Sequence, residues 1–305
     1  MTRGGRPVTA DPPACPAPAA DPRRPRRFSL PRGAVDTRAH VIGAPPAYPF
    51  VADRSYTPPP AAPAAYLKML DDTGLDRGVL IQVSVHGSDN RLLFEALRAH
   101  PDRLRGVAVM PVGLPDRAYA QAQAAGVRGL RLNVLFGGGI GLEDLERYDA
   151  LASELGWHLQ LLVDARNLPE LAPRLAEVRA AVVVDHMGHM PVSLGLDHPG
   201  FQTLIGLVRD GAWVKLSGAF RVSDQPDWAD TIPIAKALIE AGPDRCVWGS
   251  DWPHVAHWGR MMQVADLLDL LADWAPDESV RRRVLLDNPA RLYGFSPRLD
   301  HADGA

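Results

Sequence analysis

Eight short apolar runs recur along the chain from residue 33 onward, and they predict strands that are buried on both faces. They are rich in valine, leucine and isoleucine without strict alternation, as in a parallel sheet that helices cover. Most segments between them place apolar residues at helical spacing, as in residues 90–101 and 145–156. The eight runs are residues 34–41, 78–85, 105–111, 126–134, 157–164, 181–188, 213–220 and 245–252.

Alternation of eight strands with helices over about 250 residues predicts an α/β protein with a (β/α)8 TIM-barrel fold. We place this barrel at residues 33–296. An open doubly wound sheet is the alternative, but it has fewer strands and usually carries a glycine fingerprint after its first strand. No such fingerprint follows residues 34–41. The barrel is therefore the predicted fold.

The two ends of the chain differ from the barrel. Residues 1–32 are rich in proline, alanine and arginine and contain almost no large apolar side chains, so we expect a disordered tail. The arginines of residues 23–27 resemble a twin-arginine export signal, but no apolar stretch follows them, so export is not expected. Residues 297–305 form a short C-terminal tail.

Composition and charge narrow the function classes. The chain is 46% hydrophobic and 23% charged, with a formal net charge of −3, so no general field attracts nucleic acid or an acidic membrane. No apolar run is long enough to span a bilayer. The two cysteines, Cys15 and Cys246, form no disulfide framework, so the cytoplasm is the predicted location. The sequence leaves open whether the protein forms a homo-oligomer.

Polar residues gather at the C-terminal ends of the predicted strands, which is where TIM barrels carry their active sites. Isolated buried charges cost several kcal/mol or more, so packing alone does not explain such a cluster. We therefore predict a functional site there. The candidates are Arg38, His40, Ser84, His86, Arg131, Asn133, Asp164, Asp185, His186, Ser217, Arg221, Asp251 and His254.

The first predicted strand, VDTRAHV, raises the question of a metal. Two histidines spaced H-x-H would share a face of the strand, but Arg38 stands at the first position and only His40 remains. A guanidinium stays protonated and has no lone pair for a cation. Beside a divalent metal its charge would oppose binding, whereas without a metal it supplies positive charge itself. The metal-free alternative is the simpler one.

Several motifs together resemble a known family. VDTRAHVIG, VSVHGSDN, GVRGLRLN, VVVDHMG, VWGSDWPH and LLDNPARLYGF occur in order across the predicted barrel. They resemble the amidohydrolase-related (amidohydrolase 2) TIM-barrel hydrolases, and more narrowly the 2-pyrone-4,6-dicarboxylate lactonases and their sugar-lactone relatives. The resemblance implies a hydrolase that acts on small organic acids or lactones, in the lactonase without a metal.

The resemblance also implies roles for individual positions. Asp251 matches the general base that activates water. The other matches are His186 and His40 for strand histidines, Arg131 and Arg221 for arginines that bind a substrate carboxylate, and Tyr56 for a loop tyrosine near the site.

Three positions depart from the family pattern. Arg38 replaces a histidine, Gly137 stands where the dicarboxylate lactonase has another arginine, and Leu162 replaces a tyrosine. Because one expected clamp for a dianion is missing, the same dicarboxylate is not the expected substrate. The glycines of residues 136–141 form no phosphate loop, and we expect a flexible lid or a loop of close approach.

Several site residues have structural alternatives. Asp251 could instead cap a following helix. Asp185 and His186 are neighbours on a predicted strand, so we expect only one of them to face the barrel interior. Ser84, His86 and His254 complete the predicted surroundings of the substrate.

Together these observations predict a hydrolase that opens a lactone or cyclic ester of a small carboxylic acid. Asp251 would activate water, Arg38, His40 and His186 would stabilise the oxyanion, and no cofactor would be required. One alternative is a metal-dependent amidohydrolase or decarboxylase with His40, His186 and Asp251 as ligands of zinc or manganese. The other alternative is a barrel that binds a small acid without catalysing a reaction.

Overall fold

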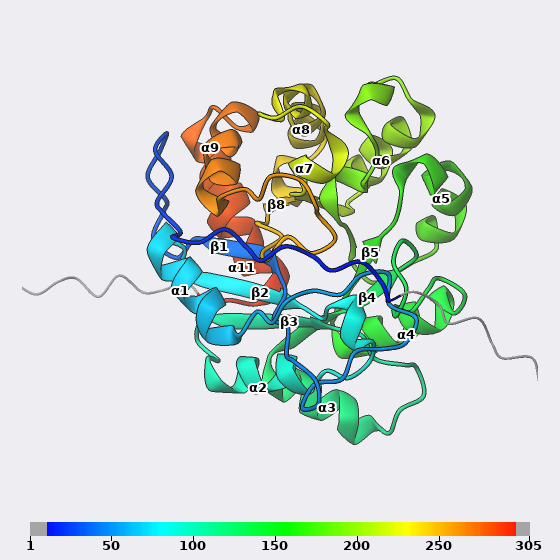
Figure 1. Cartoon of the computed structure of the whole chain (residues 1–305). Coiled ribbons are helices and arrows are strands. Elements are labelled where there is room, and N and C mark those ends of the chain that lie inside the picture. Colours follow the sequence, from blue (N-terminus) through cyan, green and yellow to red (C-terminus); the bar gives the residue numbers. More distant parts are fainter. Residues whose placement is uncertain (1–10, 297–305) are drawn as a thin grey trace, which may run out of the picture.

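A computed structural model of the chain describes residues 11–296. Its centre is an eight-stranded parallel sheet in which each strand pairs with the next, in the order β1 to β8 (Figure 1). The strands are β1 (Val35–Ala39), β2 (Arg77–Ile81), β3 (Leu104–Ala108), β4 (Val127–Asn133), β5 (His158–Leu162), β6 (Val182–Val184), β7 (Trp213–Leu216) and β8 (Cys246–Trp248).

Contacts between β8 and β1 bring the first and last strands together. Thr37 Oγ1 donates to the Trp248 carbonyl at 2.7 Å, and the His40 amide donates to the Trp252 carbonyl at 2.8 Å. The predicted TIM barrel and all eight strands are confirmed. Each predicted run extended past the observed strand, because it included the first residues of the loop that follows.

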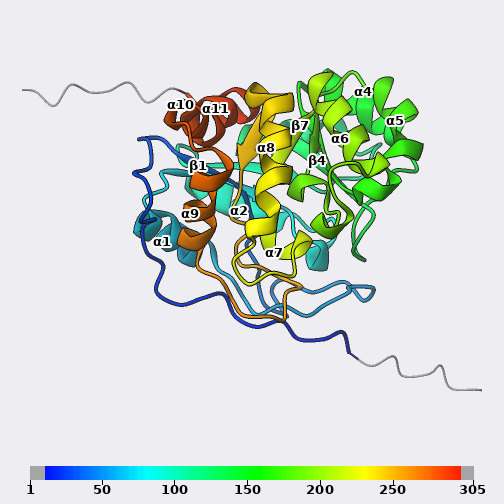
Figure 2. The same cartoon turned by 90° about the horizontal axis from the view of Figure 1, so that it is seen from above.

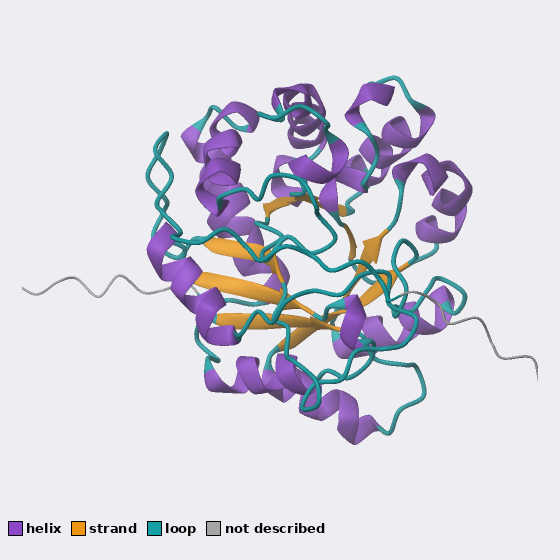
Figure 3. Ribbon diagram, viewed as in Figure 1, coloured by secondary structure: helices purple, strands orange, loops and turns teal. Residues whose placement is uncertain are grey.

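Helices surround the sheet on its outer side, as Figure 3 shows. They are α1 (Pro63–Thr73), α2 (Arg91–Ala99), α3 (Asp116–Ala125), α4 (Leu145–Leu155), α5 (Leu168–Ala176), α6 (Pro199–Arg209), α7 (Ala219–Val222), α8 (Ile232–Ala241), α9 (Val264–Trp274), α10 (Glu278–Arg282) and α11 (Asn288–Tyr293). The helical spacing of residues 90–101 and 145–156 thus corresponds to α2 and α4. None of the helices in the described part of the chain is long and apolar enough to cross a membrane.

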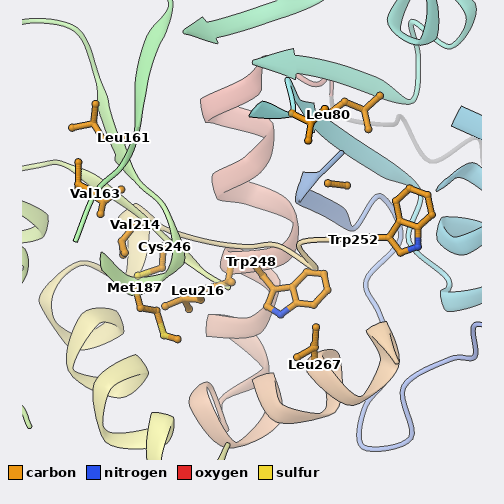
Figure 4. Close-up of a cluster of buried hydrophobic side chains, with 14 of the residues drawn as sticks. Leu80, Leu161, Val163, Met187, Val214, Leu216, Cys246, Trp248, Trp252 and Leu267 are labelled. Carbon is orange, nitrogen blue, oxygen red and sulfur yellow. The ribbon is translucent and has the colours of Figure 1, made fainter. Parts of the chain in front are cut away.

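The apolar core lies mainly between the sheet and the helices. Figure 4 shows part of it, with Leu80 from β2, Leu161 from β5, Leu216 from β7, Trp248 from β8 and Leu267 from α9. A smaller cluster joins β1, β2 and β3 to the end of the described chain, where Tyr293 and Phe295 are buried. Strands buried on both faces explain why the apolar runs lacked alternation.

Residues 11–32, which we call the N-terminal strap, are placed against the barrel, so the prediction of a disordered tail is wrong for them. The strap runs across the loops at the C-terminal ends of the strands (Figures 1 and 2). Ala14 forms a parallel bridge with Thr57, and the Cys15 amide donates to the Thr57 carbonyl at 2.8 Å. Backbone pairing of this kind does not require the large apolar side chains that the composition lacks.

Arginines of the strap also pair with acidic residues of α9. The amides of Arg26 and Arg27 donate to Asp269 at 2.7 and 2.9 Å, and Arg27 Nη2 donates to Asp273 at 2.8 Å. Arg23 forms an ion pair with Asp266. Residues 1–10 of the predicted tail, and the predicted C-terminal tail 297–305, lie outside the described residues.

Candidate active site

Six of the predicted site residues line one small cavity at the C-terminal ends of the strands. They are Arg38, His40, Tyr56, Arg131, His186 and Arg221. Phe136, Val255 and Ala256 complete its wall. The free volume of the cavity is about 10 Å³, which is room for about one water molecule.

Local irregularities of the strands bring Arg38 and His186 to this cavity. The pairing register of β1 with β2 shifts between Asp36 and Ala39, and Arg38 lies within this irregular part. His186 follows the end of β6 at Val184 and has a φ of 53°. A histidine at positive φ is uncommon, and such conformations occur often at functional sites.

Asp251 lies directly beside the cavity and is fully buried. Its Oδ2 accepts a 2.6 Å hydrogen bond from Arg221 Nε, whereas its Oδ1 has no hydrogen bond within the described residues. Three groups face this Oδ1: Arg38 Nε at 3.4 Å, His186 Nε2 at 3.7 Å and His40 Nε2 at 3.9 Å. The described hydrogen bonds give Asp251 no capping role, because its side chain accepts no backbone amide. One carboxylate oxygen is therefore left for another partner.

Arg38 connects the charged groups around Asp251. Its side chain is 2% exposed. Nη2 donates to His186 Nε2 at 3.2 Å, Nη1 lies 3.3 Å from Asp185 Oδ2, and Nε faces Asp251. Two buried carboxylates thus compensate one buried guanidinium, and its N–H groups are not all used by hydrogen bonds.

The hydrogen bonds of the two histidines define their tautomers. His40 Nδ1 lies 2.7 Å from the Ile81 carbonyl, which can only accept, so Nδ1 carries the proton. His186 Nε2 lies opposite a guanidinium, which can only donate, so this Nε2 accepts and Nδ1 donates to Ser217 Oγ at 3.0 Å. Both rings therefore carry their free lone pair on Nε2, and that of His186 accepts from Arg38.

Burial keeps both rings neutral. It lowers the pKa of His40 well below its usual value, and the Arg38 charge lowers it further. The pKa of His186 is lowered in the same way, by burial first and then by Arg38. Neutral imidazoles with these tautomers accept hydrogen bonds through Nε2. The prediction that His40 and His186 stabilise an oxyanion would require an N–H donor, which these tautomers do not place on Nε2.

The same geometry tests the alternative of a metal site. His40 Nε2, His186 Nε2 and Asp251 Oδ1 do converge, but Arg38 occupies the lone pair of His186 and faces the free oxygen of Asp251. A divalent cation there would meet the guanidinium charge and would lack one ligand. These residues do not fit a metal ion while Arg38 keeps this position.

A layer of polar side chains lies beneath the site, inside the barrel. Gln160 Nε2 donates to both oxygens of Asp185 at 3.0 and 2.9 Å, and Lys215 Nζ donates to Gln160 Oε1 at 2.8 Å. Burial alone would raise the pKa of Asp185, but Arg38 and Lys215 outweigh it and lower the value. Burial lowers the pKa of Lys215 to about 7.

Asp185 and His186 both contact Arg38, so the expectation that only one of them faces the interior is wrong. The alternation rule holds within a strand, but β6 ends at Val184 and the backbone turns at the next residues. Gln160 and Lys215 were not predicted as site residues at all. The signal for them was a single polar residue within the apolar runs LQLL and WVKL.

Arg131 is the cavity arginine without a carboxylate partner among its described contacts. Its Nη1 donates to the Gln82 carbonyl at 2.8 Å and approaches Ser84 Oγ at 3.5 Å, and its Nε has no described hydrogen bond. Burial lowers its pKa to about 10, which leaves it charged at neutral pH. Ser84 also accepts from Asn133 Nδ2 at 3.2 Å, so it stands behind Arg131.

Tyr56 and Phe136 form an apolar side of the same cavity. Their ring centroids are 5.9 Å apart in an edge-to-face arrangement. Burial raises the pKa of Tyr56 to about 12, so it keeps its proton.

His86 and His254 lie outside the cavity lining. His86 Nε2 accepts from the Gly43 amide at 3.2 Å, and its Nδ1 lies 3.2 Å from the Pro49 carbonyl, so it supports the loop after β1. His254 lies under Phe220, with ring centroids 5.3 Å apart. Direct substrate contact by either histidine stays a prediction, and their described contacts are with the protein.

The glycine loop approaches other backbone closely, which matches one of its two predicted roles. The amide of Gly137 donates to Ser55 Oγ at 3.0 Å, and the amide of Gly138 donates to Asp53 Oδ2 at 3.2 Å. A Cβ on Gly138, whose φ is +82°, would lie 2.4 Å from the Ser84 carbonyl oxygen. The loop thus packs between residues 51–55 and Ser84.

Comparisons with known proteins agree with this geometry. The amidohydrolase family profile matches residues 35–295. The chain is 35% identical to the 4-sulfomuconolactone hydrolase of Hydrogenophaga intermedia, over 88% of this chain and 91% of that protein. It is also 35% identical to the 2-pyrone-4,6-dicarboxylate hydrolase of Comamonas testosteroni, over 90% and 94% of the two chains.

A solved structure shows the same fold. The apo structure of a protein from Agrobacterium tumefaciens superposes with a TM-score of 0.81 at 29% identity, covering 88% of this chain and 98% of that chain. The family match spans nearly all of the barrel, including every cavity residue named above. The chain therefore belongs to the amidohydrolase family.

Proposed function

We propose that this protein hydrolyses a lactone, or a related cyclic ester, of a small carboxylic acid, and that it does so without a metal ion. Two relatives at 35% identity are named as hydrolases of 4-sulfomuconolactone and of 2-pyrone-4,6-dicarboxylate. The observation that carries the mechanism is the buried Oδ1 of Asp251, which has no described hydrogen bond and faces the cavity groups.

Asp251 and His40 are suited to hold the attacking water. Asp251 Oδ1 and His40 Nε2 are both acceptors and lie 3.9 Å apart. A water that donates one hydrogen to each of them directs its oxygen lone pairs away from both, toward a bound carbonyl. Asp251 takes a proton as the water oxygen attacks, which is general base catalysis. The ring C–O bond then breaks, and Asp251 returns this proton to the departing ring oxygen.

Arg38 is the group best placed to stabilise the oxyanion. It lies beside the same Oδ1, and it has N–H groups that the described hydrogen bonds do not use. Donors that are fixed before the reaction and directed at the developing charge are the most effective kind, and two carboxylates hold this guanidinium in place. His186 contributes by accepting from Arg38 and so orienting it.

Arg131 is our candidate for binding an anionic group of the substrate. An arginine buried to 3% exposure and lacking a described carboxylate partner needs a counter-charge, and a substrate carboxylate or sulfonate supplies one. Arg221 is committed to Asp251 through Nε and to the Val255 carbonyl through Nη2. It therefore orients the base, and its remaining N–H groups, including both on Nη1, have no hydrogen bond among the described residues.

Gly137 bears on the choice of substrate. It replaces an arginine that the resemblance to the dicarboxylate lactonases would require, and its amide is occupied by Ser55. One anionic substituent fits the single unpaired arginine better than two. Lactones with one carboxylate or sulfonate beside the ring are therefore the proposed class.

The test is acid release from a panel of lactones that includes 4-sulfomuconolactone and 2-pyrone-4,6-dicarboxylate. The wild-type protein should release acid from at least one lactone with a single anionic substituent, and Asp251→Asn should lower kcat by roughly 10²–10⁴-fold. Asp164→Asn is the matched control, because that carboxylate also ends a strand but pairs with Arg166 outside the cavity.

The outcomes separate the alternatives. Full turnover by Asp251→Asn would remove Asp251 from the mechanism. Turnover that appears only when zinc or manganese is added would favour the metal-dependent alternative. Tight binding of a lactone without turnover under any of these conditions would identify a binding barrel.

A further inference from the structure

The cavity is too small for any substrate of the proposed class. About 10 Å³ holds one water molecule, whereas a substituted lactone has ten or so non-hydrogen atoms. Substrate entry therefore requires that part of the wall moves. The wall includes Tyr56 from the loop after β1, and Val255 and Ala256 from the loop after β8.

The N-terminal strap binds both of these loops. On one side, the Cys15 amide donates to the Thr57 carbonyl, and the Thr57 amide donates to the Pro13 carbonyl at 2.9 Å, directly after Tyr56. On the other side, the Ala256 amide donates to Cys15 Sγ at 3.3 Å, and Trp258 Nε1 donates to the Ala14 carbonyl at 2.8 Å. Three consecutive strap residues thus connect two loops of the cavity wall.

Cys15 lies close to the site as well as to the wall. Burial raises the pKa of its thiol, and the charge of Arg221 opposes this rise. Arg221 is the residue that holds Asp251. The strap therefore reaches the surroundings of the proposed base.

A second set of contacts fastens the strap farther along the chain. Arg23 and Arg27 pair with Asp266 and Asp273 of α9, and Asp269 accepts the Arg26 and Arg27 amides. These ion pairs are partly exposed, so each is weak and reversible. Residues 11–32 lie before residues 35–295, the range that the family profile matches.

We propose that the N-terminal strap is the closing element of the active site: it holds the Tyr56 and Ala256 loops together, and substrate enters only when residues 13–15 lift from them. The strap thereby limits which substrates reach Asp251. A test of this proposal by turnover rests on the proposed hydrolase function, but the opening of the strap can be measured without any substrate.

The first experiment measures opening through Cys15 itself. The full-length protein is treated with iodoacetamide at a fixed alkaline pH, and modification is followed by mass spectrometry of the intact protein and its peptides. Cys246 is an internal control because it is fully buried. Arg23→Ala/Arg27→Ala removes the side-chain ion pairs with α9 and leaves the backbone bonds to Asp269. Arg147→Ala/Arg174→Ala removes comparable exposed pairs elsewhere.

We expect the strap variant to be modified at Cys15 at least threefold faster than the wild type, with the control variant unchanged. Equal rates in the strap variant and the wild type would contradict the fastening of the strap by its ion pairs with α9. Because no lactone is involved, this result stands even if the proposed hydrolase activity is not found.

The second experiment locks the strap. Ala256→Cys places a second thiol on the residue whose backbone nitrogen lies 3.3 Å from Cys15 Sγ. Oxidation should form a disulfide, detected as a loss of two hydrogens by mass spectrometry, and should lower lactone turnover at least tenfold. Reduction with dithiothreitol should restore it.

The control is Cys15→Ser/Ala256→Cys, in which oxidation should leave turnover unchanged. Failure of the disulfide to form would contradict the placement of Cys15 against Ala256. A locked protein with the turnover of its reduced form would overturn the proposal that the strap must lift.

Discussion

Arg38 is the residue on which the chemistry of the site depends most directly. Its guanidinium touches His186, Asp185 and Asp251 within 3.4 Å, so it takes the central position among the groups that could otherwise bind a cation. An arginine is held by hydrogen bonds to neutral nitrogen and to carboxylates, and in turn it directs N–H groups at developing negative charge. Arginine in place of histidine at position 38 therefore adds a positive charge to the site and removes lone pairs that could bind a metal.

We expect Arg38→Gln to lower kcat by a factor of roughly 10²–10³, which is the usual cost of losing one oxyanion donor. KM should change little, because Arg131 still binds the substrate anion. Steady-state kinetics on the lactone found in the panel measure both constants. Arg91→Gln, an exposed arginine that pairs with Asp89, is the control. An Arg38→Gln enzyme with wild-type kcat would exclude this role.

Lys215 gives the folded protein a distinctive pH dependence. Its pKa is lowered to about 7 in the folded state by burial, against about 10.4 in an unfolded chain. Between these two values the unfolded state binds more protons, so the free energy of unfolding contributed by Lys215 rises with pH from about 7 to about 10.4.

Urea unfolding of the wild type and Lys215→Met at a series of pH values tests this. The stability of the wild type relative to the variant should increase from neutral to alkaline pH, by an amount on the order of 1–4 kcal/mol. Other alkaline groups titrate in both proteins and cancel in the difference. A difference that is independent of pH would show that the folded pKa of Lys215 is not lowered.

The residues of the cavity were predictable to different degrees. Arg38, His186 and Asp251 stand at strand ends, where barrel geometry brings distant segments together, and the sequence therefore predicts their proximity. Gln160 and Lys215 lie deeper in the barrel, where a polar residue within an apolar run is the only signal. The tautomers of His40 and His186 depend on contacts with Ile81 and Arg38, which no sequence pattern specifies.

Among the elements, the irregular ends of strands place the site residues. The register shift in β1 and the end of β6 at Val184 let Arg38, Asp185 and His186 meet. Strand periodicity extrapolated across these points gave a wrong prediction for Asp185. The glycine loop of residues 136–141 shows the opposite case, since close approach was one of the two roles predicted from its composition and the backbone contacts require it.

Gly138→Ala tests that requirement. The added Cβ would lie 2.4 Å from the Ser84 carbonyl oxygen at a φ of +82°, so backbone must shift near Arg131. We expect a loss of about 1–3 kcal/mol in the free energy of unfolding beyond that of Gly156→Ala, and a lower kcat/KM. Gly156 is the matched control because its φ is +64° and nothing lies within 4 Å of an added Cβ. Equal losses in the two variants would show that the loop adapts freely.

For the whole molecule, the barrel was predictable and the strap was not. Eight apolar runs specify the sheet because each strand is buried on both faces. The strap is held by backbone pairing with Thr57 and by ion pairs with α9, and neither type of contact leaves an apolar pattern in the sequence. Low hydrophobicity therefore predicted disorder for residues that cover the proposed active site.

The proposed activity is a property of the whole molecule: this member of the amidohydrolase family hydrolyses a lactone with an arginine in place of a metal. The most direct measurement is turnover of the best lactone of the panel by chelator-treated protein, with the metal content of the same sample determined in parallel. We predict full turnover with metal far below one ion per chain, and no gain on adding zinc or manganese. Turnover that disappears with the metal and returns with either ion would contradict the account.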